Sequence, residues 1–112
     1  MPESSSGVPP GTLVMLVLRV LQSGTLHGYA IAQRIKEDSG ELLRAEEGSL
    51  YPALQRMLRE GLLESEEGTS TKGRPTRIYS VTEAGLRHLE REVLSFEKMF
   101  TGITRVLAFD KA

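Results

Sequence analysis

The sequence predicts a mainly α-helical domain with one small β-hairpin. Four stretches place apolar residues at helical spacing, and two short strand-like stretches enclose a turn between the third and the fourth of them. The last helical stretch repeats its apolar residues in a heptad pattern. At 112 residues the chain has the length of one domain, and a domain of this size buries its core incompletely, so we expect it to form oligomers.

The composition is typical of a soluble globular protein, with 39% hydrophobic and 26% charged residues and a net charge of −1. The absence of cysteine excludes disulfides, thiolate metal sites and a cysteine nucleophile. Residues 1–10 lack the basic and apolar regions of a signal peptide and predict a flexible arm. The apolar run 12–21 contains Arg19 and is too short to span a membrane. We therefore expect a cytoplasmic protein.

The first two helices differ in how apolar they are. Thr12 is predicted to cap the first, in which every residue from 13 to 21 except Arg19 is apolar. Such a helix needs cover on nearly all sides, so we expect a second subunit to supply part of it. The second helix begins near Leu26 and ends before Gly40.

The third helix is predicted to be amphipathic. Ser49 is its candidate N-cap and Gly61 ends it, with an apolar stripe formed by Leu50, Leu54, Met57 and Leu58. The opposite face carries an amide and two guanidinium groups, and consists of Pro52, Gln55, Arg56 and Arg59, with Tyr51 on its flank.

A hairpin follows directly. Residues 62–67 and 77–81 are predicted strands, and residues 68–76 between them have turn-forming composition and predict a long, mobile tip. No acid lies among the three cations of this region, which are Lys72, Arg74 and Arg77.

The last helix is predicted to begin at Thr82-Glu83. Its apolar residues alternate in steps of three and four, which favours pairing with a second copy over packing within one subunit. This dimerisation stripe consists of Leu86, Leu89, Val93, Phe96, Phe100, Ile103 and Leu107.

The order of three helices, a hairpin and a helix is typical of a winged helix-turn-helix, in which the third helix enters the major groove of DNA. The hairpin, or wing, then reaches the sugar–phosphate backbone or the adjacent minor groove. We predict that the three wing cations contact phosphates and that Arg74 enters a narrow minor groove. The alternative is a solvent-exposed tip without a partner.

The chain resembles the PadR-like transcriptional regulators over about residues 13–89. The resemblance rests on several motifs in one order, namely His27-Gly28-Tyr29-Ala30-Ile31, Glu47-Gly48-Ser49-Leu50-Tyr51-Pro52-Ala53-Leu54, Gly61-Leu62-Leu63, Gly73-Arg74-Pro75, Tyr79 and Val81-Thr82-Glu83-Ala84-Gly85. It implies a dimeric bacterial repressor that binds a short inverted repeat and dimerises through its C-terminal part, here the short-tailed branch. The recognition helix would present Ser49, Tyr51, Pro52, Gln55, Arg56 and Arg59.

Several residues have competing interpretations. Tyr51 is predicted to contact a phosphate through its hydroxyl, although it could simply pack. Gln55 either recognises adenine or is a surface residue. Glu60 could pair with either neighbouring arginine, and Tyr29 is predicted to be structural rather than a DNA contact. The two histidines, His27 and His88, have no nearby ligand partners and do not indicate a metal site.

We therefore predict a sequence-specific DNA-binding regulator without a cofactor, acting as a homodimeric repressor whose two recognition helices lie about 34 Å apart. The alternative is a winged-helix adaptor that binds a protein and not DNA. No catalytic constellation or phosphate-binding loop indicates an enzyme.

The expected division is a flexible arm at 1–10, a DNA-binding domain at 11–82 and a dimerisation helix at 83–112. A small apolar or aromatic effector could bind between the first and last helices, although a closed core is the favoured prediction. The residues that would face it are Met15, Leu18, Phe96 and Phe100.

Overall fold

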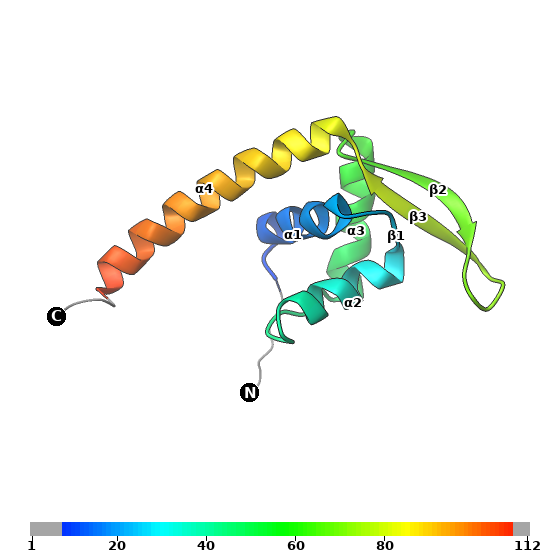
Figure 1. Cartoon of the computed structure of the whole chain (residues 1–112), viewed down its shortest axis with the longest axis horizontal. Coiled ribbons are helices and arrows are strands. Elements are labelled where there is room, and N and C mark those ends of the chain that lie inside the picture. Colours follow the sequence, from blue (N-terminus) through cyan, green and yellow to red (C-terminus); the bar gives the residue numbers. More distant parts are fainter. Residues whose placement is uncertain (1–7, 109–112) are drawn as a thin grey trace.

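The computed structural model describes residues 8–108; residues 1–7 of the predicted arm lie outside this range. Four helices and a three-stranded antiparallel sheet follow in the order α1, β1, α2, α3, β2, β3 and α4 (Figure 1). The helices are α1 (Pro10–Gln22), α2 (Gly28–Asp38), α3 (Glu47–Arg59) and α4 (Glu83–Leu107), and the strands are β1 (Leu26–His27), β2 (Leu63–Thr69) and β3 (Pro75–Val81). This is the predicted winged helix-turn-helix with a long C-terminal helix.

Helix α1 is the centre of the core. It packs against α2, α3, α4 and β3, which bury Leu13, Val17 and Leu18 almost completely. One subunit thus covers most of this helix and leaves Val14, Met15 and Leu16 partly buried, so the cover expected from a second subunit is limited to these residues. The helix also begins at Pro10 and not at Thr12, because proline is well suited to a first helical turn.

The sequence did not predict strand β1. Leu26 and His27 pair with Tyr79 and Ile78 of β3, so α2 begins at Gly28 and not near Leu26. Two residues are too few to show a strand pattern. The strand nevertheless fixes the start of α2 to the sheet from which the wing extends.

Helix α3 begins two residues before the predicted cap. Glu46 occupies the N-cap position, so Ser49 lies inside the helix and Pro52 in its second turn. Proline there cannot donate to the carbonyl four residues earlier, and that residue is Gly48. The apolar stripe is confirmed: Leu50, Leu54 and Met57 are fully buried. Gly61, with φ +78°, follows the C-cap Glu60 as predicted.

The paired strands of the wing are longer than predicted. Its strands pair from Leu63–Val81 out to Thr69–Pro75, which leaves a loop of residues 70–74. Within the loop, the Ser70 amide donates to the Arg74 carbonyl at 2.8 Å, and Gly73 adopts φ +79°. The loop at the tip is therefore shorter than predicted and contains a hydrogen-bonded turn.

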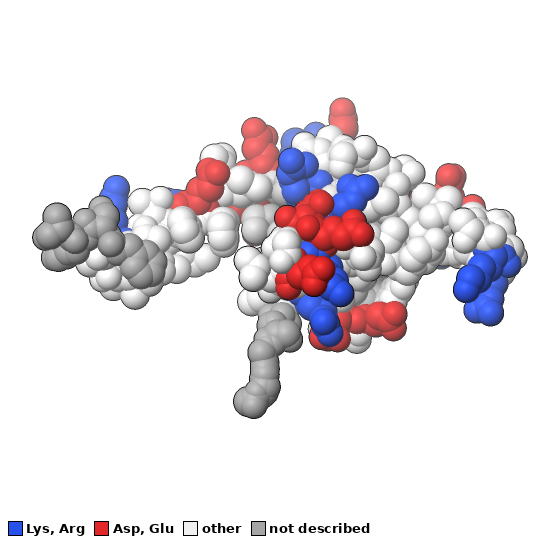
Figure 2. All heavy atoms as spheres, turned by 60° about the horizontal axis from the view of Figure 1, so that its bottom comes forward, with Lys and Arg blue, Asp and Glu red and all other residues white. Residues whose placement is uncertain are grey.

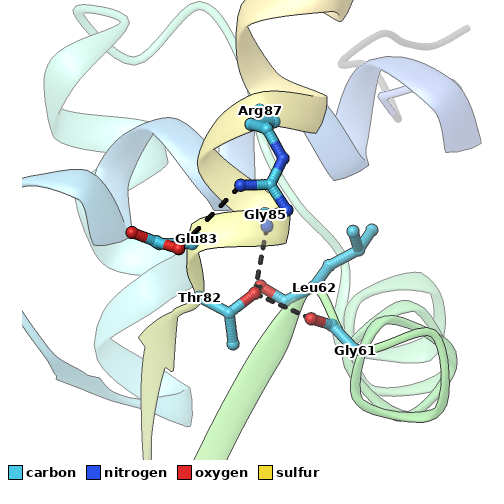
Figure 3. Close-up of polar contacts among 6 residues, drawn as sticks. All are labelled: Gly61, Leu62, Thr82, Glu83, Gly85 and Arg87. Atoms are coloured by element: carbon cyan, nitrogen blue, oxygen red, sulfur yellow. Dashed lines mark hydrogen bonds and ion pairs between the residues drawn. The ribbon is translucent and has the colours of Figure 1, made fainter.

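Helix α4 begins at Glu83 as predicted, and its start is fixed to the end of α3 (Figure 3). The Thr82 hydroxyl donates to the Gly61 carbonyl at 2.7 Å and accepts from the Gly85 amide at 3.0 Å. The Thr82 amide donates to the Leu62 carbonyl at 3.1 Å. One threonine therefore caps α4 and attaches it to the turn that links α3 to β2.

Candidate nucleic-acid interface

The polar face of α3 is exposed along its whole length. All six residues predicted there, Ser49, Tyr51, Pro52, Gln55, Arg56 and Arg59, are exposed. Within residues 8–108, no carboxylate lies within 4.0 Å of Arg56 or Arg59, so the alternative in which Glu60 pairs with them is not formed. Both guanidinium groups remain available for a ligand.

The two flanks of this face have different neighbours. Ser49, Pro52 and Arg56 line a hollow of about 200 Å³ together with Val8, Pro10, Leu13 and Ala53, so this flank borders the start of α1. On the other flank, a β-carbon placed on Gly28 would lie 3.3 Å from the Tyr51 ring and 3.4 Å from the Tyr79 ring. The glycine thus lets α2, α3 and β3 meet closely at Tyr51.

Tyr51 packs at the flank of this face and is also partly exposed. Its side chain is 37% exposed. Burial, and secondarily the charges of Glu47 and Tyr79, raises the pKa of Tyr51 above its ordinary value. The hydroxyl therefore stays protonated at neutral pH and can donate to an anionic oxygen. The two interpretations of Tyr51 are compatible, since the ring packs beside Gly28 while the residue as a whole stays partly exposed.

The wing carries an isolated cationic cluster (Figure 2). Lys and Arg atoms gather at its tip without an acidic atom beside them, whereas the middle of the same face mixes both charges. Lys72, Arg74 and Arg77 are exposed, and none of them pairs with a carboxylate within the described part of the chain. Arg77 donates to the Ser65 hydroxyl at 3.1 Å, which holds this guanidinium against β2.

The start of α2 connects the recognition helix to the wing. Tyr29 follows Gly28, which lies against Tyr51, and it also lines a hollow with Lys72 and Arg74. The polar face of α3 and the wing tip therefore belong to one continuous surface. A single surface of α3 and the wing agrees with the sequence prediction, whereas the part that α2 plays in it was not predicted, because it depends on β1.

The dimerisation stripe on α4 is divided in two. Leu89 is only 5% exposed and belongs to the core of its own subunit, and Val93 packs against that core. The stripe's remaining residues, Leu86, Phe96, Phe100, Ile103 and Leu107, are exposed. Figure 1 shows that the C-terminal half of α4 extends beyond α1, so within residues 8–108 α1 does not cover the end of this helix.

The predicted effector residues are only partly brought together. Met15 and Phe96 line a hollow of about 190 Å³ between α1 and α4. Phe100 stacks on Phe96 with ring centroids 6.1 Å apart but does not line the hollow. Leu18 is fully buried in the core, so its prediction as an effector contact is wrong for this subunit.

Other kinds of site are not indicated in the described residues. Residues 8–108 contain no group of three or more His, Asp or Glu side chains placed to bind a metal ion. None of their helices combines the length and apolarity needed to cross a membrane.

Comparison with known proteins identifies relatives of this chain. The family model for the transcriptional regulator PadR-like family matches residues 17–91. An uncharacterized 37.1 kDa protein of transposon Tn4556 from Streptomyces fradiae is 44% identical over 85 residues, which are 76% of this chain and 23% of that protein. The chain therefore spans about a quarter of that relative. The negative transcriptional regulator PadR of Bacillus subtilis is 27% identical over 73 residues, 65% of this chain and 40% of that protein.

Solved structures share the fold. A PadR family transcriptional regulator from Eggerthella lenta is 33% identical, with a TM-score of 0.75 over 88% of this chain and 84% of that one. Bacillus subtilis PadR in complex with operator DNA is 26% identical, with a TM-score of 0.66 over 72% of this chain and 47% of that one.

Proposed function

Because the chain belongs to the PadR-like family of transcriptional regulators, we propose that it is a cytoplasmic repressor that binds an inverted-repeat operator as a homodimer. The family consists of DNA-binding regulators and not enzymes, in agreement with the sequence prediction. The observation that supports the proposal most directly is the continuous surface formed by the polar face of α3, the start of α2 and the cationic wing.

Each part of this surface has its own role in the proposal. Helix α3 enters the major groove, where Gln55 reads a base edge and Arg56 and Arg59 contact bases or phosphates. The hydroxyls of Ser49 and Tyr51 donate to phosphates, and Pro52 packs against the edge of the groove. The wing cations neutralise backbone phosphates, with Arg74 in the minor groove.

The homodimer is supported by the exposed apolar half of α4. In the proposed division, residues 11–82 bind DNA and residues 83–112 hold two copies together. Phe96, Phe100 and Ile103 of one copy would be covered by the other, which removes an apolar surface that is unusual on a monomer. Each dimer would then place two recognition helices about one helical turn of DNA apart, roughly 34 Å.

A salt titration tests the proposal. The test measures the affinity of the protein for the DNA upstream of its own coding region by fluorescence anisotropy at several salt concentrations. Six wing cations in a dimer, each neutralising one phosphate, give a slope of log K against log salt of about −5 or steeper. A flat salt series, or equal affinity for all duplexes including one without an inverted repeat, would contradict sequence-specific DNA binding.

Two variants are expected to separate phosphate contacts from base reading. Arg74→Ala should weaken binding to every duplex alike, and its slope should become shallower by about 2, because a dimer loses two contacts. Gln55→Ala should leave the slope unchanged and alter the preference among operator variants. Arg91→Ala, which removes an exposed arginine from α4, is the matched control and should change neither quantity. Identical behaviour of the first two variants would show that this division of roles is wrong.

The hollow between α1 and α4, which Met15 and Phe96 line, is the proposed binding site of a small apolar or aromatic effector. Binding there should raise the melting temperature of the wild type and not that of Met15→Glu, which places a charge at the wall. The melting temperature is measured by thermal unfolding in the presence of each member of a panel of aromatic acids and lipophilic cations. The absence of a shift across the panel would count against effector binding.

A further inference from the structure

A hollow of about 360 Å³ lies between the start of α2 and the wing loop. It is lined by Tyr29 from α2 and by Ser70, Thr71, Lys72, Arg74, Pro75 and Thr76 from the wing. Tyr29 is 53% exposed, and within residues 8–108 its hydroxyl has no hydrogen-bond partner. The hollow therefore combines a free hydroxyl donor with two unpaired cations.

The Tyr29 ring is held in place by His27. It stacks on His27 with ring centroids 5.5 Å apart and an angle of 18° between the planes. His27 belongs to β1 and pairs with Ile78 of β3, the strand that begins at the wing loop. Tyr29 is thus attached to the same sheet as Lys72 and Arg74, which fixes its position relative to them.

The lining of the hollow is suited to an anion with several oxygen atoms. It contains two cationic side chains, a phenol and three aliphatic hydroxyls, and it contains no carboxylate. The neighbouring hollow that Tyr29 also lines contains one carboxylate, Glu37, and one guanidinium group, Arg34, so it lacks the excess of positive charge found at the wing. Phosphate oxygens accept hydrogen bonds from hydroxyl groups and are attracted by Lys and Arg.

We propose that this hollow binds one backbone phosphate of the operator, with the Tyr29 hydroxyl donating to a phosphate oxygen that Lys72 neutralises, while Arg74 reaches from the same loop into the minor groove. The inference rests on the proposed DNA-binding function and adds Tyr29 to it as a direct contact, in place of the structural role predicted from the sequence. The phosphate lies on the strand that passes from the groove occupied by α3 to the groove occupied by the wing. Tyr51, Gly28 and Tyr29 follow one another along that path.

Tyr29→Phe tests the hydrogen bond without removing the ring. The stack on His27 is retained, so the melting temperature should stay close to that of the wild type. Affinity for the operator should fall about tenfold or more, the effect expected for loss of a hydrogen bond to a charged group. The salt slope should not change, because a neutral hydroxyl releases no counterion, whereas Lys72→Gln should make the slope shallower by about 2. Lys98→Gln on α4 is the charge-matched control and should behave like the wild type.

A series of operator duplexes, each with one phosphate replaced by a neutral methylphosphonate, locates the phosphate. Replacing one phosphate at a time should reveal a position, between the two grooves, where the wild type loses affinity. At that position Tyr29→Phe should lose much less than the wild type does, because the hydrogen bond is already absent.

The outcomes separate the inference from the function on which it rests. If the wild type binds DNA with a steep salt slope while Tyr29→Phe binds within twofold of it, the hollow does not hold a phosphate. The same conclusion follows if no phosphate between the two grooves is sensitive in the wild type. If the wild type itself shows no salt-dependent binding to any duplex, the proposed function fails instead.

Discussion

Replacing Gly85 by alanine is expected to lower the free energy of unfolding by about 2 kcal/mol or more. A β-carbon at this position would collide with the Leu62 carbonyl oxygen, and it would lie 2.7 Å from Val81 Cγ2 and 3.2 Å from Leu18 Cδ2. The carbonyl belongs to the backbone and also accepts the Thr82 amide, so it cannot move without breaking that hydrogen bond. The collision outweighs the better helix propensity of alanine, which is worth about 1 kcal/mol.

Thermal unfolding measures this effect. A loss of about 2 kcal/mol corresponds to a fall in melting temperature of roughly 8 °C or more in a domain of this size. Gly102→Ala is the matched control, because it makes the same change in the same helix with nothing within 4 Å of the new β-carbon. That variant should gain about 0.5–1 kcal/mol. If both variants were stabilised to the same extent, the close contact between α4 and the turn after α3 would not exist in solution.

Phe100→Asp is expected to separate the proposed dimer into monomers and to weaken operator binding by about 100-fold or more. Phe100 is 56% exposed, stacks on Phe96 and lies on the part of the heptad stripe that its own subunit leaves uncovered. A charge there would be buried without a partner if a second copy covered the stripe. The monomer should remain folded, because the core formed by α1, α2, α3 and the sheet does not include Phe100.

Analytical ultracentrifugation gives the oligomeric state and anisotropy gives the affinity. Thr101→Asp introduces the same charge one residue further along α4, on a different face from the heptad stripe, and should leave both quantities unchanged. If Phe100→Asp stays a dimer with full operator affinity, the exposed half of α4 is not the contact between subunits. If Phe100→Asp becomes monomeric and still binds the operator with full affinity, a dimer does not bind the two half-sites simultaneously.

Much of the interface was accessible from local sequence patterns. The apolar stripe of α3 indicates which side is buried, so the same periodicity places Gln55, Arg56 and Arg59 outside, where the structure has them. Turn-forming residues locate the wing loop, and the lack of acids near Lys72 and Arg74 predicts their unpaired state. The start of α4 follows from Thr82, a residue type with a strong preference for helix N-caps.

Contacts between segments that are distant in sequence could not be obtained in this way. Tyr29 is unremarkable in its own helix, and it becomes a candidate DNA contact only because β1 pairs with β3 and brings the wing loop across from it. Leu18 is an apolar residue of the first helix and is a candidate effector contact by sequence, but in the structure it is fully buried in the core.

The sequence by itself determined the order of the four helices and the hairpin, the buried side of α3, the cationic tip and the family. These features depend on the spacing and chemistry of neighbouring residues, which the chain displays directly. Only the tertiary structure decided which apolar residues are covered within one subunit. A heptad has the same pattern along its whole length, yet α4 reaches beyond α1, so Leu89 is buried and Phe100 is exposed. Periodicity identifies an apolar face, and the packing of distant segments determines what covers it.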